Sequence, residues 1–207
     1  MTERMEGRGE SYRSDAGPLA MIALAVPLFI WSAFNAGYFD DSSENFIIPL
    51  SVFFGAPIAF ATAMWAFYRR DSYLATGAGV FAAFWVSYGM LLWLTQEGVI
   101  TGETTGDVRG FFFVPWAVTF GTVWLASMRQ HWTLALVAMG AAVMFVSLSI
   151  AHFDGSSDLL KTGGWVGFLT AGLAWYAALA EMVNIEFERE VLPTSPGWFE
   201  RLRTGSR

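Results

Sequence analysis

The sequence predicts an all-α, polytopic membrane protein with six transmembrane helices, and three observations support this prediction. The 207-residue chain is 55% hydrophobic with a mean hydropathy of +0.44, which is too apolar for a soluble domain of this size. Charged residues are absent over several stretches of roughly 20 residues, the helical length that crosses a bilayer core of about 30 Å. These stretches also lack the alternation of polar and apolar residues that transmembrane β-strands require.

Six stretches without Lys, Arg, Asp or Glu are long enough to span the bilayer, and each predicts one helix. In chain order they are Ala16–Phe39, Phe46–Tyr68, Ser72–Gln96, Gly110–Met128, Trp132–Ala151 and Thr162–Ala180. They predict an N-terminal tail over residues 1–15, a six-helix domain over residues 16–185 and a C-terminal tail over residues 186–207.

Prolines mark the first two predicted helices. Pro18 suits the first turn of a helix, where the missing backbone N–H is not needed. Pro27 and Pro57 fall inside their helices and leave carbonyl groups without partners. Each of these two residues predicts either a simple kink or irregular backbone that lines a solute path.

The last two helices are bounded by titratable residues whose roles the sequence leaves open. His131 and His152 stand at opposite ends of the fifth helix, too far apart to share a ligand. Each fits an interfacial histidine, and His152 also fits a pH sensor. Glu181 follows the sixth stretch, about 27 Å along the helix from Gly163 at 1.5 Å per residue. It fits an interfacial carboxylate, a group in a cytoplasmic vestibule or a subunit contact.

The basic residues predict how the chain is oriented in the membrane. Of the 12 Lys and Arg residues, ten lie in the termini and in the second and fourth loops, and only Arg109 and Lys161 lie on the other side. This asymmetry predicts a multi-pass protein of the plasma or inner membrane with both termini in the cytoplasm. The external loops are acidic, so we expect no electrostatic steering of an anion toward that face.

Residues that support chemistry are scarce inside the predicted helices. The helix interiors contain no charged residue, which argues against a buried ion pair or a carboxylate proton relay. The chain has no cysteine and no catalytic or metal-binding constellation. We therefore expect neither an enzyme nor a bound metal or cofactor, and no motif indicates nucleic-acid binding. Among the neutral polar residues, Asn35 stands out because its amide is too polar to face lipid.

Two stretches at the ends of the helical region carry a family resemblance. The first is DAGPLAMIALAVPLFIWSAFNAGYF, through Pro18, Leu19, Asn35, Gly37, Tyr38 and Phe39. The second is GGWVGFLTAGLAWYAALAEMVNIEFEREVLP, through Gly163, Gly164, Trp165, Gly167, Tyr176, Glu181, Asn184, Phe187, Val191, Leu192 and Pro193. Weaker matches are Gly55 and the pair Phe84 and Trp85. Together these residues resemble the acetate uptake transporter family, which includes bacterial succinate–acetate permeases, over residues 15–193.

The resemblance implies both an architecture and a function. It implies six-helix subunits that assemble as a homohexamer, each with its own narrow solute path between the helices. It also implies passage of acetate, similar short-chain monocarboxylates and succinate, with proton coupling and channel-like conduction both open. The apolar constriction of the family corresponds to Leu24, Phe81 and Ala141 in this chain.

The chain departs from the family pattern at positions that bear on the solute. Where the family carries Gln and Glu in the second helix and a Gly-Asn turn after it, this chain has Ala59, Ala66, Arg70 and Asp71. The constriction changes from Phe, Tyr and Leu to Leu, Phe and Ala, which removes a hydroxyl and one large side chain. These departures leave the choice of substrate open.

The sequence supports two hypotheses for the solute. In the first, Asn35 and Ser32 bind a carboxylate at the external mouth, and Leu24, Phe81 and Ala141 form a dry gate. In the second, the protein is a channel for a small neutral solute such as urea or ammonia, which the lack of buried charge equally permits. A structural or sensory membrane protein without transport is a third hypothesis.

Overall fold

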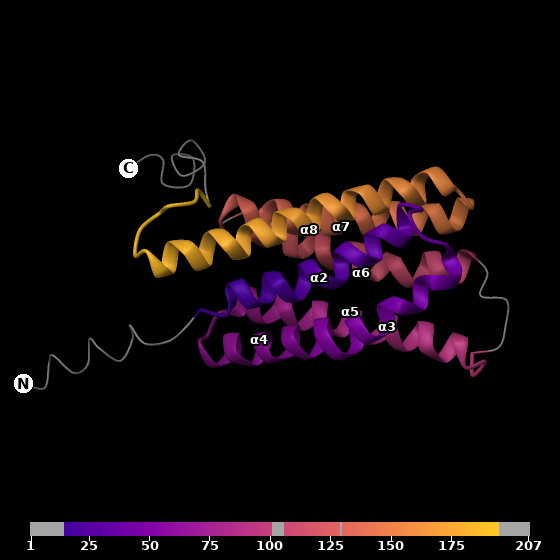
Figure 1. Ribbon diagram of the computed structural model, residues 1–207, viewed down its shortest axis with the longest axis horizontal. Helices are drawn as coiled ribbons and strands as arrows, with labels where there is room; N and C mark the ends of the chain where they lie inside the picture. The colour runs from indigo at the N-terminus through magenta and orange to yellow at the C-terminus, as the bar shows by residue number, and fades with distance from the viewer. Residues whose placement is uncertain (1–14, 101–105, 129, 195–207) are drawn as a thin grey trace, which may run out of the picture.

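Long apolar helices make up most of the protein in the computed structural model, which describes residues 15–100, 106–128 and 130–194 (Figure 1). Within these residues, six helical segments are long and apolar enough to cross a membrane. This finding confirms the predicted fold class, an all-α protein with six transmembrane helices. The six spans are Gly17–Asn35, Ser43–Tyr68, Ser72–Gln96, Asp107–Ser127, Trp132–Asp154 and Ser157–Glu186.

Five of the spans are regular α-helices, and three of them are longer than the charge-free stretches that predicted them. Charged side chains near a helix end reach the water interface at little cost, so a charge does not end the helix. The fourth helix therefore includes Arg109 in its first turn, and the sixth includes Lys161. These helices are α2 (Gly17–Asn35), α5 (Ser72–Gln96), α6 (Gly106–Ser127), α7 (Trp132–Asp154) and α8 (Ser157–Glu186).

The second span is built from four consecutive segments rather than one regular helix. They are η1 (Asp41–Phe46), α3 (Ile47–Pro49), η2 (Leu50–Gly55), which has the wider π-helical winding, and α4 (Ala56–Tyr68). Pro57 lies in the first turn of α4, where it removes no hydrogen bond of that helix. Gly55 just before it permits close packing, because a Cβ there would lie 3.0 Å from Trp85 and 3.1 Å from Pro27.

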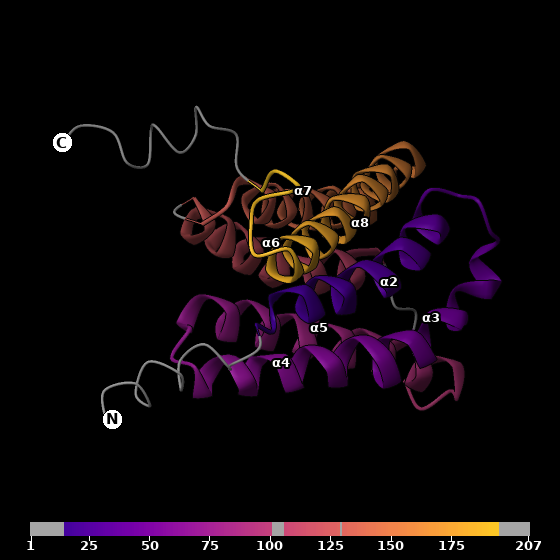
Figure 2. The same cartoon turned by 60° about the vertical axis from the view of Figure 1, so that its left-hand side comes forward.

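The helices pack in two groups with α2 between them. α6 packs against α7 and α7 against α8, while α4 packs against α5, and α2 contacts both α8 and α4 (Figures 1 and 2). The described ends of the chain, Asp15 and Thr194, line one cavity and so lie at the same end of the bundle. An even number of spans produces this arrangement.

The two family-like motifs form a single contact between α2 and α8. A Cβ on Gly164 would lie 2.8 Å from the backbone of both Asn35 and Ala36, so the two helices approach this closely only because residue 164 is glycine. Beyond this point Tyr38 packs edge-on against Trp165, with ring centroids 5.8 Å apart. Residues that are far apart in the sequence therefore serve one helix–helix joint.

The remaining residues of the first motif delimit α2 and cover its surface. Pro18 lies in the first turn and is buried. Gly37 follows the end of the helix with a φ of +80°, a conformation that glycine adopts without strain. Leu19 is 45% exposed, so its side chain lies on the outer surface of the bundle.

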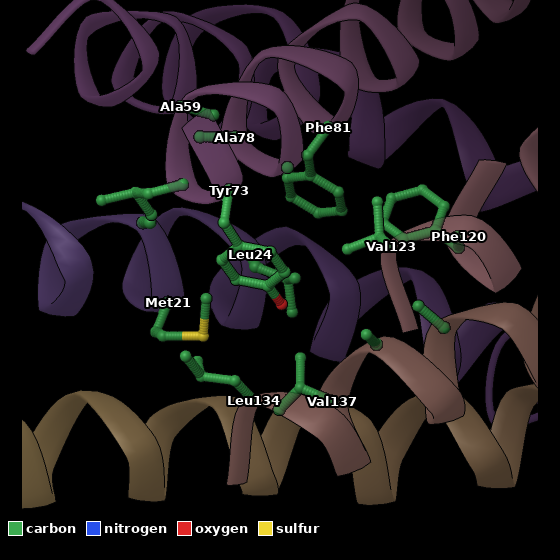
Figure 3. Close-up of a pocket in the computed structure, with 15 residues that line it drawn as sticks. Met21, Leu24, Ala59, Tyr73, Ala78, Phe81, Phe120, Val123, Leu134 and Val137 are labelled. Atoms are coloured by element: carbon green, nitrogen blue, oxygen red, sulfur yellow. The ribbon is translucent and has the colours of Figure 1, made fainter. Parts of the chain in front are cut away.

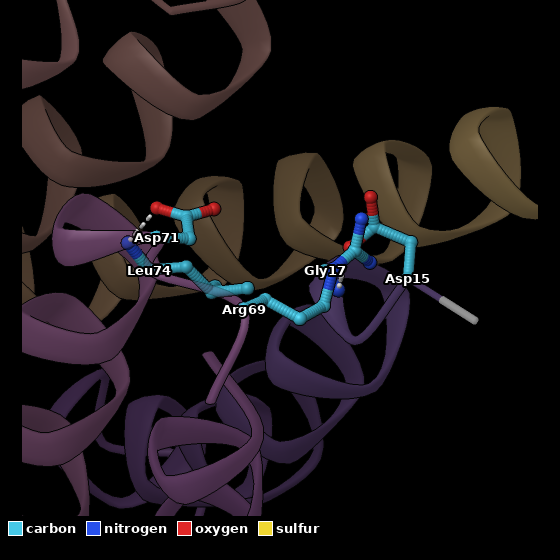
Figure 4. A network of polar contacts seen from close by, with 5 residues as sticks. All are labelled: Asp15, Gly17, Arg69, Asp71 and Leu74. Atoms are coloured by element: carbon cyan, nitrogen blue, oxygen red, sulfur yellow. Dashed lines mark hydrogen bonds and ion pairs between the residues drawn. The ribbon is translucent and has the colours of Figure 1, made fainter. Parts of the chain in front are cut away.

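The turn between α4 and α5 holds one residue in an unfavourable conformation. Arg70 has a φ of +61°, in the left-handed region that costs an ordinary residue about 1 kcal/mol. On one side of it, Arg69 forms an ion pair with Asp15 at 3.7 Å. On the other side, Asp71 accepts a hydrogen bond from the backbone N–H of Leu74 at 2.9 Å (Figure 4). These two interactions fix the turn around Arg70.

Replacing Arg70 by glycine should therefore stabilise the protein. Glycine adopts a positive φ without the steric penalty, so we expect the free energy of unfolding to rise by about 0.5–1 kcal/mol. Thermal unfolding of the detergent-solubilised protein, followed by tryptophan fluorescence, measures the effect. Arg69→Gly is the matched control and should lower the stability, because it removes the ion pair with Asp15. An unchanged or lower Tm for Arg70→Gly would contradict the strain argument.

Candidate functional site

A cavity in the middle of the bundle brings together the three residues that the resemblance assigns to the constriction. Leu24 of α2, Phe81 of α5 and Ala141 of α7 all line this central cavity, whose volume is about 60 Å³. Figure 3 shows Leu24 and Phe81 among its lining residues. Phe120 and Val123 of α6 line it as well. The structure places the three residues around one space, and their role in conduction stays a prediction.

The lining of the central cavity follows helical spacing and is almost entirely apolar. Residues three and four positions apart share one face of a helix, so each helix presents an apolar face to the cavity. Of the 15 lining residues, only Tyr73 carries an oxygen or nitrogen in its side chain, and none is charged. The faces of α5 and α7 consist of Leu74, Gly77, Ala78 and Phe81, and of Leu134, Val137, Ala138 and Ala141.

Four aromatic rings close the bundle next to the central cavity. This aromatic layer consists of Trp31, Phe84, Phe113 and Phe145, none of which is more than 3% exposed. Ring centroids are 4.8 Å apart for Phe84 and Phe145, 5.5 Å for Trp31 and Phe84, and 5.9 Å for Trp31 and Phe113. Phe120, which lines the central cavity, stacks on Phe145 at 5.3 Å. The central cavity therefore ends at a layer of packed aromatic rings.

A larger vestibule opens at the end of the bundle that carries both described chain ends. Its volume is about 440 Å³, and Met21, Tyr73 and Leu134 line both the vestibule and the central cavity. Glu181 of α8 and Asp15 line the vestibule as well. Glu181 is thus a vestibule group in this structure, which is one of the alternatives that the sequence left open.

The carboxylate of Glu181 lies against the start of α2. A Cβ on Gly17 would lie 2.6 Å from Glu181 Oε1 and 2.7 Å from Oε2, so both oxygens reach the N-terminus of that helix. The unpaired N–H groups and the dipole at a helix N-terminus stabilise a negative charge. The N–H of Gly17 itself donates to Asp15 Oδ1 at 3.0 Å. Glu181 therefore joins the last span to the first.

Asn184 holds the segment after α8 against the helix. Its Oδ1 accepts hydrogen bonds from the backbone N–H groups of Val191 and Leu192, at 2.7 and 2.9 Å. Its Nδ2 donates to the carbonyl of Leu192 at 2.8 Å. About two turns earlier on α8, the hydroxyl of Tyr176 donates to the carbonyl of Pro193 at 2.8 Å. These family-like residues fold the C-terminal segment back toward the vestibule.

Replacing Asn184 by alanine should release this segment. Three hydrogen bonds are lost, and we expect the free energy of unfolding to fall by about 1–3 kcal/mol. Faster hydrogen exchange at the amides of Val191 and Leu192 would show the release directly. Tyr176→Phe removes a single bond of the same clamp and should have about one third of the effect. Unchanged exchange at Val191 and Leu192 would show that Asn184 does not hold the segment.

An outer pocket lies at the opposite end of the bundle, beyond the aromatic layer. Its volume is about 90 Å³, and its lining residues come from α5, α6 and α7 and include Arg109 and His152. Tyr88 lines it as well, donates a hydrogen bond to Glu44 and accepts one from Nε1 of Trp31 at 2.9 Å. Because Trp31 belongs to the aromatic layer, this layer separates the outer pocket from the central cavity.

Asn35 and Ser32, the residues that the sequence assigned to an external carboxylate, line none of these three spaces. Ser32 has no exposed surface and faces Gly167 and Met144, so the close contact between α2 and α8 covers it. The role of Ser32 in binding a carboxylate stays a prediction, and it requires α2 and α8 to separate at this point. Asn35 is half-buried, and its amide donates to the carbonyl of Trp31 at 3.1 Å.

Neither the aromatic layer nor the outer pocket was predicted from the sequence. One signal was present on the third helix, where Phe81, Phe84 and Tyr88 recur at helical spacing. Another was Arg109, one of only two basic residues in the loops that the arginine distribution assigns to the external side. Among the residues that the structure describes, no group of three or more His, Asp or Glu side chains is arranged to hold a metal ion.

Comparison with known proteins supports one family. The model of the GPR1/FUN34/yaaH family matches residues 9–195. Ammonia transport outward protein 2 of Saccharomyces cerevisiae is 27% identical over 173 residues, which cover 81% of this chain and 61% of the relative. The chain thus spans about three fifths of the length of that relative.

Two further relatives are more distant in sequence. Succinate-acetate/proton symporter SatP of Escherichia coli is 21% identical over 185 residues, 89% of this chain and 97% of the relative. Acetate permease A of Emericella nidulans is 21% identical over 196 residues, 88% of this chain and 66% of the relative. The solved structure of the bacterial acetate channel SatP matches with a TM-score of 0.82 at 21% identity, over 88% of this chain and 99% of that chain. This last match shows a shared fold.

Proposed function

Because this chain belongs to the GPR1/FUN34/yaaH family, we propose that it is a membrane transporter or channel for acetate and similar short-chain monocarboxylates. Two relatives carry names that point to such solutes, the succinate-acetate/proton symporter and the acetate permease. The proposed path runs from the vestibule through the central cavity and the aromatic layer to the outer pocket. All four parts lie within one chain, so in this proposal each subunit has a path of its own.

The observation that carries this proposal is the apolar lining of the central cavity. None of its lining residues is charged, so a carboxylate that enters loses its water without gaining an ionic partner. An uncompensated charge in such a space is very unfavourable, whereas a neutral acid enters far more easily. We therefore propose that the carboxylate and a proton cross the cavity together, as the neutral acid.

In this proposal the constriction and the aromatic layer have separate roles. Leu24, Phe81 and Ala141 set the width of the central cavity and thereby the size of the solute that fits. Trp31 and Phe84 belong to the closed layer next to it and must move to let the solute through. A closed apolar layer excludes water and so stops ions between passages.

A second candidate function is transport of ammonia. Ammonia transport outward protein 2 and Ammonia transport outward protein 3 of Saccharomyces cerevisiae are relatives of this chain. Neutral ammonia, like a neutral acid, crosses an apolar cavity without an ionic partner. This candidate differs from the first in that its solute gains nothing from a cation at either mouth.

Uptake into proteoliposomes tests the proposed function. Labelled acetate is offered with and without an inward proton gradient, and urea and methylammonium are offered in parallel. We expect saturable acetate uptake that the gradient accelerates and that excess propionate inhibits. Flux of methylammonium or urea without any flux of acetate would replace the proposal by the second candidate or by a urea channel.

We further propose that the protein is a homohexamer in the plasma or inner membrane with both termini in the cytoplasm. The arginine distribution supports the orientation, and the exposed apolar side chains on the helices offer surface for lipid and for neighbouring subunits. Native mass spectrometry from detergent measures the number of subunits. Cysteine accessibility at position 45 from outside the cell measures the orientation, because the chain has no cysteine of its own.

A further inference from the structure

The outer pocket combines apolar walls with two groups that can donate hydrogen bonds. Leu91 and Leu92 of α5 and Phe112 and Phe113 of α6 form its apolar lining. Arg109 and His152 provide the polar part. Pockets that bind small molecules have this composition, with a few polar groups in an apolar wall.

Arg109 is a cation without a carboxylate partner among the residues that the structure describes. Its side chain is half-buried, and no Asp or Glu of the described segments lies within 4.0 Å of it. The residue sits in the first turn of α6, where the helix dipole adds positive potential. Asp107 lies in the same turn, but its side chain is exposed and does not line the pocket. A half-buried guanidinium at a helix N-terminus favours an anion, and guanidinium binds a carboxylate through two parallel hydrogen bonds.

The other polar groups of the pocket show which donors are free for a ligand. The hydroxyl of Tyr88 bonds with Glu44 and Trp31, and the hydroxyl of Thr95 donates to the carbonyl of Leu91 at 2.8 Å. His152 stacks on Phe113 with ring centroids 5.6 Å apart and has no hydrogen bond to another described residue. The guanidinium of Arg109 and the imidazole of His152 are therefore the donors that remain.

No carboxylate is among the described residues that line the pocket. Glu44 is bonded to the hydroxyl of Tyr88 and does not line the pocket. Tyr88 thus stands between Glu44 and the pocket, and an anion beside Arg109 meets no negative group of the described lining. The pocket is locally positive on a face whose loops are otherwise acidic.

We propose that the outer pocket is a carboxylate-binding site, with Arg109 and His152 holding the carboxylate and the Phe112–Phe113 wall holding a short alkyl chain. The identity of the ligand as a short-chain monocarboxylate rests on the proposed function. The site would load the solute at the mouth, one step before the aromatic layer. The positive charge of Arg109 would attract the carboxylate to this mouth, which the acidic loops around it do not.

Equilibrium binding of labelled acetate to the purified full-length protein in lipid nanodiscs tests the site without depending on transport. We expect Arg109→Gln to weaken acetate binding about tenfold or more, since a charge-assisted bidentate contact is lost. Arg109→Lys keeps the charge without the bidentate geometry and should restore part of the affinity. His152→Phe should weaken binding by a smaller factor.

Two control variants separate binding from general charge effects. Lys161→Gln removes the other positive charge on the same side, from an exposed side chain that does not line the pocket, and should leave binding unchanged. Glu103→Gln changes an acidic residue of the preceding loop that lies outside the described residues. If Arg109 mattered only because it pairs with Glu103, Arg109→Gln and Glu103→Gln would weaken acetate binding equally, and the proposal would be wrong. Size-exclusion profiles and Tm values confirm that each variant is folded.

The outcomes distinguish the site from the proposed function. Loss of binding in Arg109→Gln, with binding retained in Lys161→Gln, supports the site whether or not acetate is transported. Equal binding by wild type and Arg109→Gln, or no binding by wild type, overturns the site. If wild type and Arg109→Gln take up acetate equally at every concentration, the proposed function is unaffected and the loading role is overturned.

Discussion

Replacing Gly164 by alanine is expected to destabilise the protein by about 3 kcal/mol or more. The added Cβ would lie 2.8 Å from the Cα of Ala36 and from the carbonyl carbon of Asn35, and closer still to the backbone nitrogen of Ala36. These are backbone atoms of α2, which cannot move aside as the end of a flexible side chain can. The two helices must separate, and the contact that joins the first and last spans is lost. Tryptophan-detected thermal unfolding in detergent measures the loss.

Gly172 provides the matched control on the same helix. A Cβ on Gly172 meets no atom within 4 Å, so alanine there only replaces a residue of poor helix propensity by a better one. We expect Gly172→Ala to leave the Tm unchanged or to raise it slightly. If Gly164→Ala and Gly172→Ala had the same Tm, the close approach of α2 and α8 at Gly164 would not exist in the folded protein.

Leu24→Ala and Ala141→Leu should shift the size of the transported acid in opposite directions. Removing the Leu24 side chain enlarges the central cavity, and we expect the flux of butyrate relative to acetate to rise about tenfold. Adding a large side chain at position 141 fills the cavity beside Phe81, and we expect acetate flux to fall about tenfold with butyrate flux abolished. Competition by acids of increasing length against labelled acetate in proteoliposomes measures both effects.

Leu169→Ala is the matched control for these variants. Leu169 is 70% exposed on α8 and does not line the central cavity, so its truncation should leave size selection unchanged. Equal selectivity in wild type, Leu24→Ala and Ala141→Leu would show that the central cavity is not the constriction. A change in Leu169→Ala of the same size as in Leu24→Ala would point to an indirect effect on the bundle.

The helices were predictable from the sequence because burying a charge in lipid is so unfavourable. This rule placed six spans but not their ends, since charged side chains near an end reach water. Arg109 and Lys161 consequently lie in N-terminal parts of α6 and α8 that the charge-free stretches did not include. The composite second span was also beyond prediction, because π-helical winding over Leu50–Gly55 depends on packing against other helices.

Lining residues of the candidate site were predictable only where the residue type at a single matched position identifies them. The resemblance named Leu24, Phe81 and Ala141 one helix at a time, and the structure places them around one cavity. The burial of Ser32 was not predictable, because the rotation of α2 about its axis decides whether a residue faces a pathway or a neighbour. That rotation is set by contacts with α8, at Gly164 and Gly167, which no local pattern on α2 reveals.

The most direct test of the account is to block the central cavity chemically during transport. Because the chain contains no cysteine, Ala141→Cys introduces a single thiol into the cavity, and Leu169→Cys introduces one on the exposed face of α8. We predict that the small, membrane-permeant reagent methyl methanethiosulfonate abolishes acetate uptake by Ala141→Cys, that excess acetate slows the modification, and that Leu169→Cys keeps its uptake. Full acetate uptake by the completely modified Ala141→Cys variant would show that the solute does not pass between Leu24, Phe81 and Ala141.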